Sequence, residues 1–332
     1  MRNTAIVVVL AALLAPGTTA RAQSTSVAVS APPGRLIDLG GYRLHLYCTG
    51  QGTPTVVLSA GAGDFATDWA LVQPEVTKHT RVCSYDRSGE GWSERGPAPR
   101  SIDQEVYDLH RLLAAAGERG PYLLAGQSLG GMVARLFAQR YRTETVGLVL
   151  VDAFSEDAQL SMNGRLVRMR ELSRQRPIPL PRDSVRPSDR LSAADEAQAR
   201  EFMAKVIGTP KIEPPFDRLP SDAQRARLWA LAQPGHYAGG DDYLAEITAR
   251  VHDETSRVPH PLGDLPLVVL DRTRDEYPPE QMAMLSKEHR EQQQALAKLS
   301  TRGTLRRVDG AGHHIQLDQP AAVVDALLSL VK

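Results

Sequence analysis

A serine inside a glycine-rich hexapeptide is the first residue of this chain whose setting suits chemistry. Ser128 is the third residue of Gly-Gln-Ser-Leu-Gly-Gly, residues 126–131, directly after the apolar run Tyr122 to Ala125. The apolar run is typical of a buried strand, and the apolar spacing after the hexapeptide predicts a helix. A serine at so sharp a strand-to-helix turn, flanked by small residues, is typical of a nucleophile elbow. We therefore predict that Ser128 is a nucleophile, with an incidental glycine-serine turn as the alternative.

A serine nucleophile needs a base beside it. The hydroxyl is weakly nucleophilic at neutral pH, so Ser128 requires a residue that takes its proton and a third group that fixes the tautomer of that base. Histidine is the expected base. Among the nine histidines of the chain, the adjacent His313 and His314 follow a predicted strand and a Gly-Ala-Gly turn. Either one is a candidate from its position alone.

Two aspartates are candidates for the third group, because each follows a predicted buried strand. Asp152 comes directly after the continuous apolar run Val146 to Val151, and Asp275 follows the run at 266–270. In a parallel sheet both strands would end at the same edge. The residues themselves leave the choice open, and the aspartate that is not the orienting acid is expected to cap a helix or form a salt bridge.

Acyl transfer to a serine places negative charge on the carbonyl oxygen, which backbone N–H groups stabilise well. Leu129 follows the serine at a predicted helix N-terminus, where the helix dipole favours an anion. Ala62 lies in the Gly-Ala-Gly sequence of residues 61–63, after another predicted strand. We predict that these two N–H groups form an oxyanion hole, although residues 61–63 are also compatible with a plain tight turn.

The elements that would position these residues form an α/β pattern. Residues 35–39 and 42–47 alternate in polarity around Gly40-Gly41 and predict a hairpin. Strands alternating with helices then imply a doubly wound, mostly parallel sheet. Further strands are expected at 55–58, 80–84, 122–125, 146–151, 267–270 and 304–308, and helices at 65–76, 102–115, 279–299 and 321–331.

The segment 154–261 interrupts this rhythm. It is rich in arginine, alanine, glutamine and proline and contains no convincing strand. We interpret it as an inserted helical cap between two parts of one core, residues 35–153 and 262–332. A cap above a rigid sheet can exclude water and shape a pocket, and a passive stabilising insertion is the alternative.

The N-terminal sequence predicts export. Arg2, the apolar run of residues 5–15 and the polar stretch ending in Ala20-Arg21-Ala22 are typical of a secretory signal peptide cleaved after Ala22. The apolar run is about half the roughly 20 residues that span a bilayer, which argues against a membrane anchor. We expect residues 23–34 to be a disordered leader and the mature protein to be secreted or periplasmic.

The composition restricts the remaining function classes. The chain has 39 Lys and Arg against 39 Asp and Glu, a formal net charge of +0, so nothing suggests a nucleic-acid or anionic-membrane partner. No P-loop, HExxH or CxxC motif is present, and we expect neither a metal nor an organic cofactor. The two cysteines, Cys48 and Cys83, are predicted to form a disulfide in an oxidising compartment, with two buried free thiols as the alternative. Oligomeric state is left open.

Four motifs in order along the chain resemble the α/β-hydrolase superfamily: LSAGA at 58–62, YDRSGEGWS at 85–93, the GQSLGG elbow and GAGH at 310–313. The resemblance implies an eight-stranded, mostly parallel sheet with a cap, and His313 as the base. The sequences GLVLVDA and HHIQLDQP look like a secreted-esterase-like branch, and related thioesterases use an acid at the place of Asp152, which we therefore rank before Asp275. Asp275 has the spacing that is usual in the superfamily, but Arg272 replaces the usual glycine of its turn. Ala60-Gly61 stands where the family often has His-Gly.

The resemblance also implies a reaction class. We expect a serine hydrolase that cleaves an ester-like bond of a small molecule through a Ser-His-Asp triad and an acyl-enzyme. Serine at the elbow argues against haloalkane dehalogenase and epoxide hydrolase chemistry, which use aspartate there. Lactonase, thioesterase, amidase, perhydrolase and carbon–carbon hydrolase activities use the same triad, because fold alone does not select the substrate. A noncatalytic hydrolase-like binding protein is the alternative from a different class.

Overall fold

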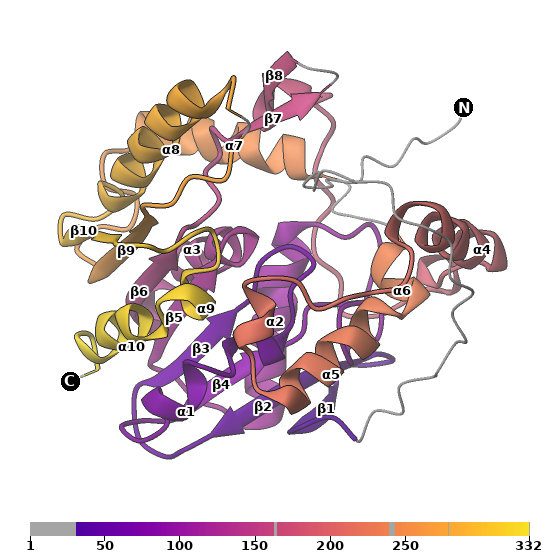
Figure 1. Ribbon diagram of the computed structural model, residues 1–332. Coiled ribbons are helices and arrows are strands. Elements are labelled where there is room, and N and C mark those ends of the chain that lie inside the picture. Colours follow the sequence, from indigo (N-terminus) through magenta and orange to yellow (C-terminus); the bar gives the residue numbers. More distant parts are fainter. Residues whose placement is uncertain (1–30, 163–164, 239–242, 278, 332) are drawn as a thin grey trace.

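A mostly parallel sheet of eight strands organises the computed structural model, which describes residues 31–162, 165–238, 243–277 and 279–331 (Figure 1). The strand order is β1-β2-β4-β3-β5-β6-β9-β10; β1 and β2 are antiparallel to their neighbours and the other pairs are parallel. The strands are β1 (Arg35–Asp38), β2 (Arg43–Thr49), β3 (Thr55–Ser59), β4 (Val82–Tyr85), β5 (Tyr122–Gln127), β6 (Thr145–Val151), β9 (Leu267–Arg272) and β10 (Gly303–Val308). The predicted fold class and all eight predicted strands are confirmed.

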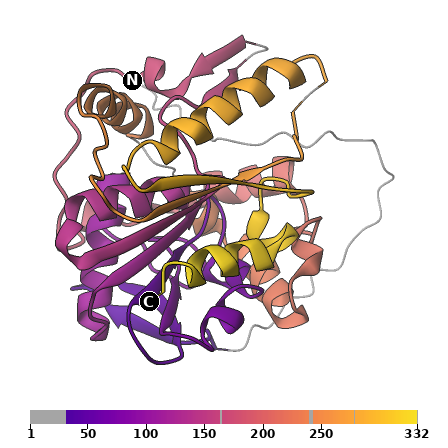
Figure 2. The same cartoon turned by 90° about the vertical axis from the view of Figure 1, so that its left-hand side faces the viewer.

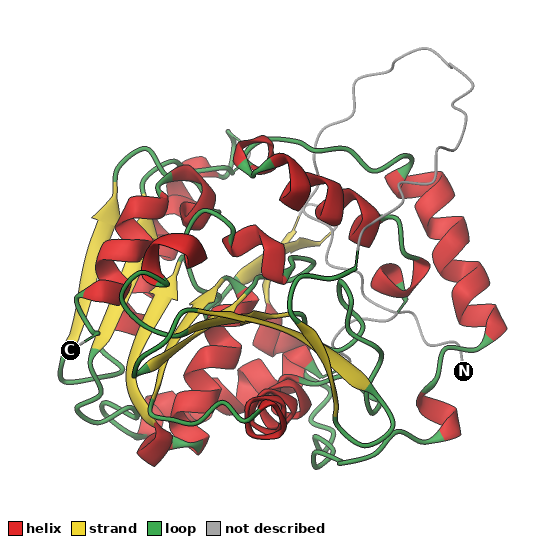
Figure 3. Cartoon of the chain, turned by 90° about the horizontal axis from the view of Figure 1, so that it is seen from below, coloured by secondary structure: helices red, strands yellow, loops and turns green. Residues whose placement is uncertain are grey.

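The central strands are buried on both faces, which explains their continuous apolar sequence. Successive residues of β5 alternate between the two cores: Leu124 packs in one, and Leu123 and Ala125 pack in the other. In β6, Leu148 and Leu150 face the first core. Helices are therefore required on both sides of the sheet, and Figure 3 shows them there.

The helices of the described chain are distributed over these two faces and the cap. One core contains residues of α2, α3, α7 and the end of α8, and the other contains residues of α1 and α10. Figure 2 shows α8 and α10 on opposite sides of β9 and β10. The helices are α1 (Gln73–Val76), α2 (Ile102–Ala116), α3 (Leu129–Arg140), α4 (Ala193–Phe202), α5 (Ser221–Leu231), α6 (Pro234–Tyr237), α7 (Leu244–Arg257), α8 (Met282–Ala297), α9 (Ile315–Asp318) and α10 (Pro320–Leu328).

The inserted segment contains a feature that the sequence analysis missed. Two four-residue strands, β7 (Gln159–Met162) and β8 (Arg165–Arg168), form an antiparallel pair apart from the main sheet (Figure 1). They are short and pair only with each other. Helices α4, α5 and α6 form the remainder beside the core, whereas Ile247 and Val251 of α7 pack within the first core.

The predicted disulfide between Cys48 and Cys83 is present. It joins β2 to β4 at directly paired positions of the antiparallel ladder. The predicted signal peptide, residues 1–22, and most of the predicted leader lie outside the described residues. At the end of that leader, the Pro33 carbonyl accepts a hydrogen bond from the buried His45 of β2. None of the helices in the described ranges combines the length and apolarity needed to cross a bilayer.

Candidate active site

Ser128 lies at the sharp turn between β5 and α3, as the elbow motif predicts. Its φ is 51°, a left-handed conformation that is uncommon for a residue with a side chain and is typical of functional sites. The turn is fixed on both sides, because the Ser128 N–H donates to Val151 (3.2 Å) and its carbonyl oxygen accepts from Phe154 (2.9 Å). The side chain is half-buried at the carboxyl edge of the sheet.

The glycines around Ser128 allow close backbone contacts. A Cβ atom on Gly126 would lie 2.2 Å from the Gly130 carbonyl oxygen, and one on Gly130 would lie 2.3 Å from the Ser59 carbonyl oxygen. Real Cβ atoms do not come so close to backbone atoms. The start of α3 therefore packs directly against the end of β3, which brings the first N–H groups of the helix beside the loop that follows β3.

The structure brings Asp152 and His313 together. Oδ2 of Asp152 lies 2.6 Å from Nδ1 of His313. Asp152 follows β6 with a φ of 43°, and its own N–H donates to Leu270 (2.9 Å). Its side chain is 0% exposed, whereas that of His313 is 23% exposed. The pair thus has one fully buried member and one that reaches the surface of the site.

The surroundings of Asp152 keep it ionised. Burial raises the pKa of this carboxyl, but contacts with His289 and His313 and the positive charge of Arg272 hold it well below its ordinary value. An ionised carboxylate only accepts hydrogen bonds, so Nδ1 of His313 carries the proton that faces Asp152. In the neutral imidazole Nε2 is then the nitrogen without a proton, which is the arrangement that a general base requires.

Arg272, at the end of β9, contacts Asp152 through both its side chain and its backbone. Its guanidinium donates to Oδ2 of Asp152, and its backbone N–H lies 3.5 Å from Oδ1. The residue in place of the usual glycine therefore binds the other aspartate. Asp275 lies three residues further on, half-buried, and within the described part of the chain no hydrogen bond or ion pair joins it to His313.

Ser128 and His313 make no direct hydrogen bond among the described side chains, but their segments are tied together. Gln127, which precedes the serine, donates from Nε2 to the His313 carbonyl oxygen at 3.1 Å. Gln127 also packs beneath Gly61, where a Cβ would meet its Oε1 at 2.2 Å. One fully buried side chain thus touches the elbow, the histidine loop and the loop after β3. Catalytic hydrogen bonds are often long in a site without substrate.

The predicted oxyanion donors lie in the loop that follows β3 and at the start of α3. Ala62 is exposed, and in the described structure its N–H donates to no protein group. Leu129 is the first residue of α3, so its N–H lacks a partner within the helix. Arg87 fixes the loop from below by donating to the carbonyl oxygens of Ala60 and Gly61. With these carbonyls held on one side, the N–H of Ala62 is available to a ligand.

The alternative histidine, His314, has a different partner. Its Nε2 lies 3.3 Å from Oδ2 of Asp64, in the loop after β3. Arg227 of α5 binds the same aspartate (3.1 Å) and also donates to Asp68. The inserted segment is therefore anchored to the loop after β3 and to the loop that carries His313 and His314 by one charge cluster. Trp229 of α5 adds a stacked contact with Trp92, with ring centroids 5.4 Å apart.

One group of side chains near the site has the composition of a metal site. Asp152, Asp271 and His289 each offer a ligand atom, and these atoms lie within 4.8 Å of one another. The Arg272 guanidinium already binds the Asp152 carboxylate. His289 in turn lies within ion-pair distance of both carboxylates, so the described contacts of this group are those of an ion-pair cluster.

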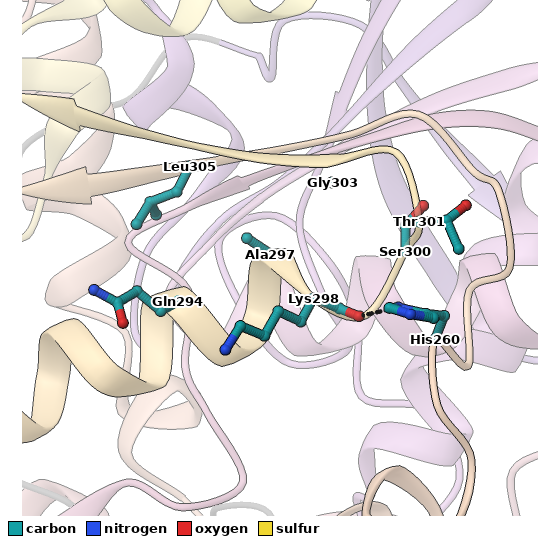
Figure 4. A pocket seen from close by; sticks show the side chains of 8 residues that line it. All are labelled: His260, Gln294, Ala297, Lys298, Ser300, Thr301, Gly303 and Leu305. Carbon is teal, nitrogen blue, oxygen red and sulfur yellow. Dashed lines mark hydrogen bonds between the residues drawn. The ribbon is translucent and has the colours of Figure 1, made fainter.

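A surface hollow of about 440 Å³ lies elsewhere, at the end of α8 and the turn into β10 (Figure 4). It is lined by residues such as Gln294, Lys298 and His260, whose Nδ1 lies 2.7 Å from the Lys298 carbonyl oxygen. None of the candidate site residues lines it. The hollow is therefore separate from the chemistry described above.

The sequence analysis missed four residues of the site: Gln127, Arg87, Arg272 and His289. Gln127 and Arg87 lie inside the GQSLGG and YDRSGEGWS motifs, in which neither residue has a predicted role. In the sequence, Arg272 stands out only because it replaces the usual glycine of its turn. His289 lies in a polar helix, and no local signal distinguishes it from the other polar residues there.

Comparison with known proteins agrees with the architecture. Residues 56–326 match the model of the family described as alpha/beta hydrolase family. A segment of 139 residues is 34% identical to 2-hydroxy-6-oxo-2,4-heptadienoate hydrolase of Pseudomonas putida and covers 40% of this chain and 49% of that protein. A segment of 103 residues is 33% identical to the uncharacterized protein YqjL of Bacillus subtilis and covers 31% and 41%. The matched segments thus span less than half of these relatives.

Two solved structures extend the likeness over most of the chain. The enol-lactonase from Burkholderia xenovorans LB400 superimposes with a TM-score of 0.58 at 19% identity, covering 87% of this chain and 96% of that chain. A thermophilic esterase from Thermogutta terrifontis superimposes with a TM-score of 0.55 at 23% identity, covering 87% and 92%. At such identities the likeness concerns the fold.

Proposed function

Because the chain belongs to the alpha/beta hydrolase family, we propose that it is a serine hydrolase that cleaves an ester-like bond through Ser128, His313 and Asp152. The observation that carries the proposal is the 2.6 Å contact between Asp152 and His313, made beside a strained serine elbow. An ionised buried aspartate, a partly exposed histidine and a half-buried serine are the three members that nucleophilic catalysis requires.

The proposed reaction follows from the proton positions. Nε2 of His313 takes the proton of the Ser128 hydroxyl while Oγ attacks the substrate carbonyl carbon. The N–H groups of Ala62 and Leu129 donate to the oxygen that becomes negative. His313 then gives its proton to the leaving alcohol as the C–O bond breaks, which leaves an acyl-enzyme. Water attacks the acyl carbon, His313 takes a proton from that water, and Ser128 recovers it as the acid leaves.

Substrates with a cleavable carbon–carbon bond and lactones are the second candidates, because two of the similar proteins act on such compounds. The Pseudomonas putida protein is named as a hydrolase of 2-hydroxy-6-oxo-2,4-heptadienoate, and one fold neighbour is an enol-lactonase. Both chemistries use attack on a carbonyl carbon and differ in the leaving group. Both relatives therefore support attack on a carbonyl carbon as the reaction class.

Hydrolysis of p-nitrophenyl esters of graded acyl length tests the proposal, with Ser128→Ala assayed in parallel. A simple lactone and 2-hydroxy-6-oxo-2,4-heptadienoate complete the substrate set. Ester turnover that disappears in Ser128→Ala supports the proposal. If only the lactone or the dienoate is hydrolysed, the second candidate substrates replace the ester in the proposal. If Ser128→Ala hydrolyses every substrate, the proposal is overturned.

We also propose that the protein is exported, secreted or periplasmic, after cleavage behind Ala22. The signal-peptide pattern of residues 1–22 motivates this proposal, and the Cys48–Cys83 disulfide supports it because disulfides persist in oxidising compartments. N-terminal sequencing of protein recovered outside the cytoplasm is expected to begin at Gln23. Recovery of the uncleaved chain inside the cells would contradict export.

A further inference from the structure

A second histidine, which is buried, contacts Asp152 at the carboxylate oxygen that His313 does not use. His289 of α8 is 8% exposed, and its Nε2 lies 2.9 Å from Oδ1 of Asp152 and 3.2 Å from Oδ1 of Asp271. Nε2 is therefore within ion-pair distance of both carboxylates. Its geometry does not meet the requirements of a hydrogen bond to either of them. The proton transfers described above do not use this histidine.

The charges around His289 favour its imidazolium form. Burial lowers the pKa of His289, but the contacts with Asp152 and Asp271 raise it above its ordinary value. Asp271 has a second cation nearby, because Nε of Arg307 lies 3.3 Å from its Oδ2. Asp152 has Arg272 in addition to His289. Two buried carboxylates are thus compensated by cations on three different elements, β9, α8 and β10.

The contacts of Asp152 divide between its two oxygens. Oδ2 faces His313 and the Arg272 guanidinium, and Oδ1 faces His289 and the Arg272 backbone N–H. A carboxylate held at one oxygen only can rotate about its χ2 bond, whereas contacts at both oxygens fix its plane. The plane of Asp152 decides where the imidazole of His313 points.

We propose that His289 is a positioning residue, which rests on the proposed function of Asp152 as the triad acid. It holds the Asp152 carboxylate ionised and fixed in orientation by occupying Oδ1, so that Oδ2 stays aligned with Nδ1 of His313. His289 itself touches neither substrate nor the reacting atoms. Its removal therefore slows the chemical step and leaves substrate binding unchanged.

The test compares His289→Leu, which removes the polar contact with Oδ1 of Asp152, with His289→Gln, which keeps a polar N–H group of similar reach beside that oxygen. Misplacement of a catalytic group by about 1 Å costs on the order of 100-fold in rate, so we expect His289→Leu to lower kcat about 10- to 100-fold with KM within about threefold. His289→Gln is expected to recover most of that loss. Asp271→Asn is the matched control, because it disturbs the same cluster without removing the contact with Asp152, and it is expected to keep near-normal kcat.

A double-mutant cycle separates positioning from general destabilisation. If His289 acts through Asp152, adding His289→Leu to Asp152→Asn lowers kcat little further. If the two residues act independently, the two fold-losses in kcat multiply. Wild-type kcat in folded His289→Leu, or full multiplication of the two losses, would overturn the proposal. If the thermal transition shows that His289→Leu does not fold, His289→Asn is measured instead, because its shorter side chain does not reach the Asp152 carboxylate. Wild-type kcat in His289→Asn, or full multiplication of its loss with that of Asp152→Asn, would likewise overturn the proposal.

The rate of Ser128 modification by a fluorophosphonate gives a readout that does not depend on the substrate. A wild-type protein that hydrolyses no ester but is labelled would refute the ester proposal alone. In that case the labelling rate of His289→Leu is still expected to be about 10- to 100-fold below that of the wild type. Equal labelling rates would overturn the positioning role. A wild-type protein that is neither active nor labelled would overturn both.

Discussion

Asp152 and His313 are separated by 161 positions in the sequence and lie 2.6 Å apart in the structure. The aspartate follows β6, and the histidine lies between β10 and α9. Both segments end at the same edge of the sheet as Ser128, because β5, β6 and β10 run parallel. Of the two aspartates that the sequence presents as candidate acids, Asp152 is the one in contact with His313.

Substitution of the two aspartates is expected to have unequal effects. Asp152→Asn retains the shape of the side chain but places an amide against Nδ1 of His313, which favours the wrong tautomer and is expected to lower kcat by several orders of magnitude, up to about 10⁴-fold. Asp275→Asn is the matched control and is expected to change kcat less than about threefold. Steady-state ester kinetics measure both, and a larger loss in Asp275→Asn would contradict the assignment of the acid.

Arg227 is expected to anchor the cap. It is buried between Asp64 and Asp68, and loss of one member of such a cluster leaves unpaired buried charges. We expect Arg227→Met to lower the free energy of unfolding by about 3–5 kcal/mol. Arg218→Met is the control, because Arg218 is half-exposed at its contact with Asp318, and it is expected to cost less than about 1 kcal/mol. Urea unfolding measures both, and equal losses would refute a special role for Arg227.

Glu156 is expected to make stability depend on acid pH. Burial raises the pKa of this carboxyl, but its ion pair with buried Arg135 lowers it to about 2. A folded-state pKa below the unfolded value gives stability that is present above about pH 4.5 and is lost as the pH falls towards 2. The contribution is about 3 kcal/mol.

Unfolding free energies measured between pH 6 and pH 2.5 are therefore expected to fall less steeply in Glu156→Gln than in the wild type. Glu201→Gln serves as the control, because the contact of Glu201 with Lys205 is exposed, and its profile is expected to run parallel to the wild-type profile. Parallel profiles for Glu156→Gln as well would show that the Arg135 pair contributes nothing to acid sensitivity.

The disulfide is expected to stabilise the fold. Cys48 and Cys83 are 35 positions apart, and a cross-link that closes a loop of this length stabilises by about 2–4 kcal/mol through the entropy of the unfolded chain. The double variant Cys48→Ala/Cys83→Ala is expected to unfold at lower temperature than the oxidised wild type and to be insensitive to reductant. Alkylation of both thiols in the unreduced wild type, seen by mass spectrometry, would contradict the disulfide.

The sequence predicted the elements of the sheet well because they have strong local signals. Runs such as Val146 to Val151 and Leu267 to Leu270 are apolar throughout, since strands in the middle of a parallel sheet are buried on both faces. The antiparallel pair of β7 and β8 has no comparable signal. Its strands have four residues each, include charged and polar side chains, and form a sheet only with each other.

The site could be predicted only in part. Ser128 and the two-histidine turn have local motifs, whereas the choice of acid depends on contacts between segments far apart in the chain. Arg272 is 120 positions from Asp152, and His289 lies on a helix of mostly polar residues. Both appear ordinary in sequence, and their relation to Asp152 follows from the packing of α8 and β9 against the end of β6. Long-range electrostatic contacts of this kind have no spacing rule.

Covalent labelling of Ser128 tests the central claim most directly. The purified protein is treated with a fluorophosphonate, and the adduct is located by peptide mass spectrometry, with Ser128→Ala and Asp152→Asn treated in parallel. We predict one adduct, on the peptide containing Ser128, that is absent from Ser128→Ala and forms far more slowly in Asp152→Asn. An adduct on another residue, or equal labelling of the wild type and Asp152→Asn, would contradict a triad of Ser128, His313 and Asp152.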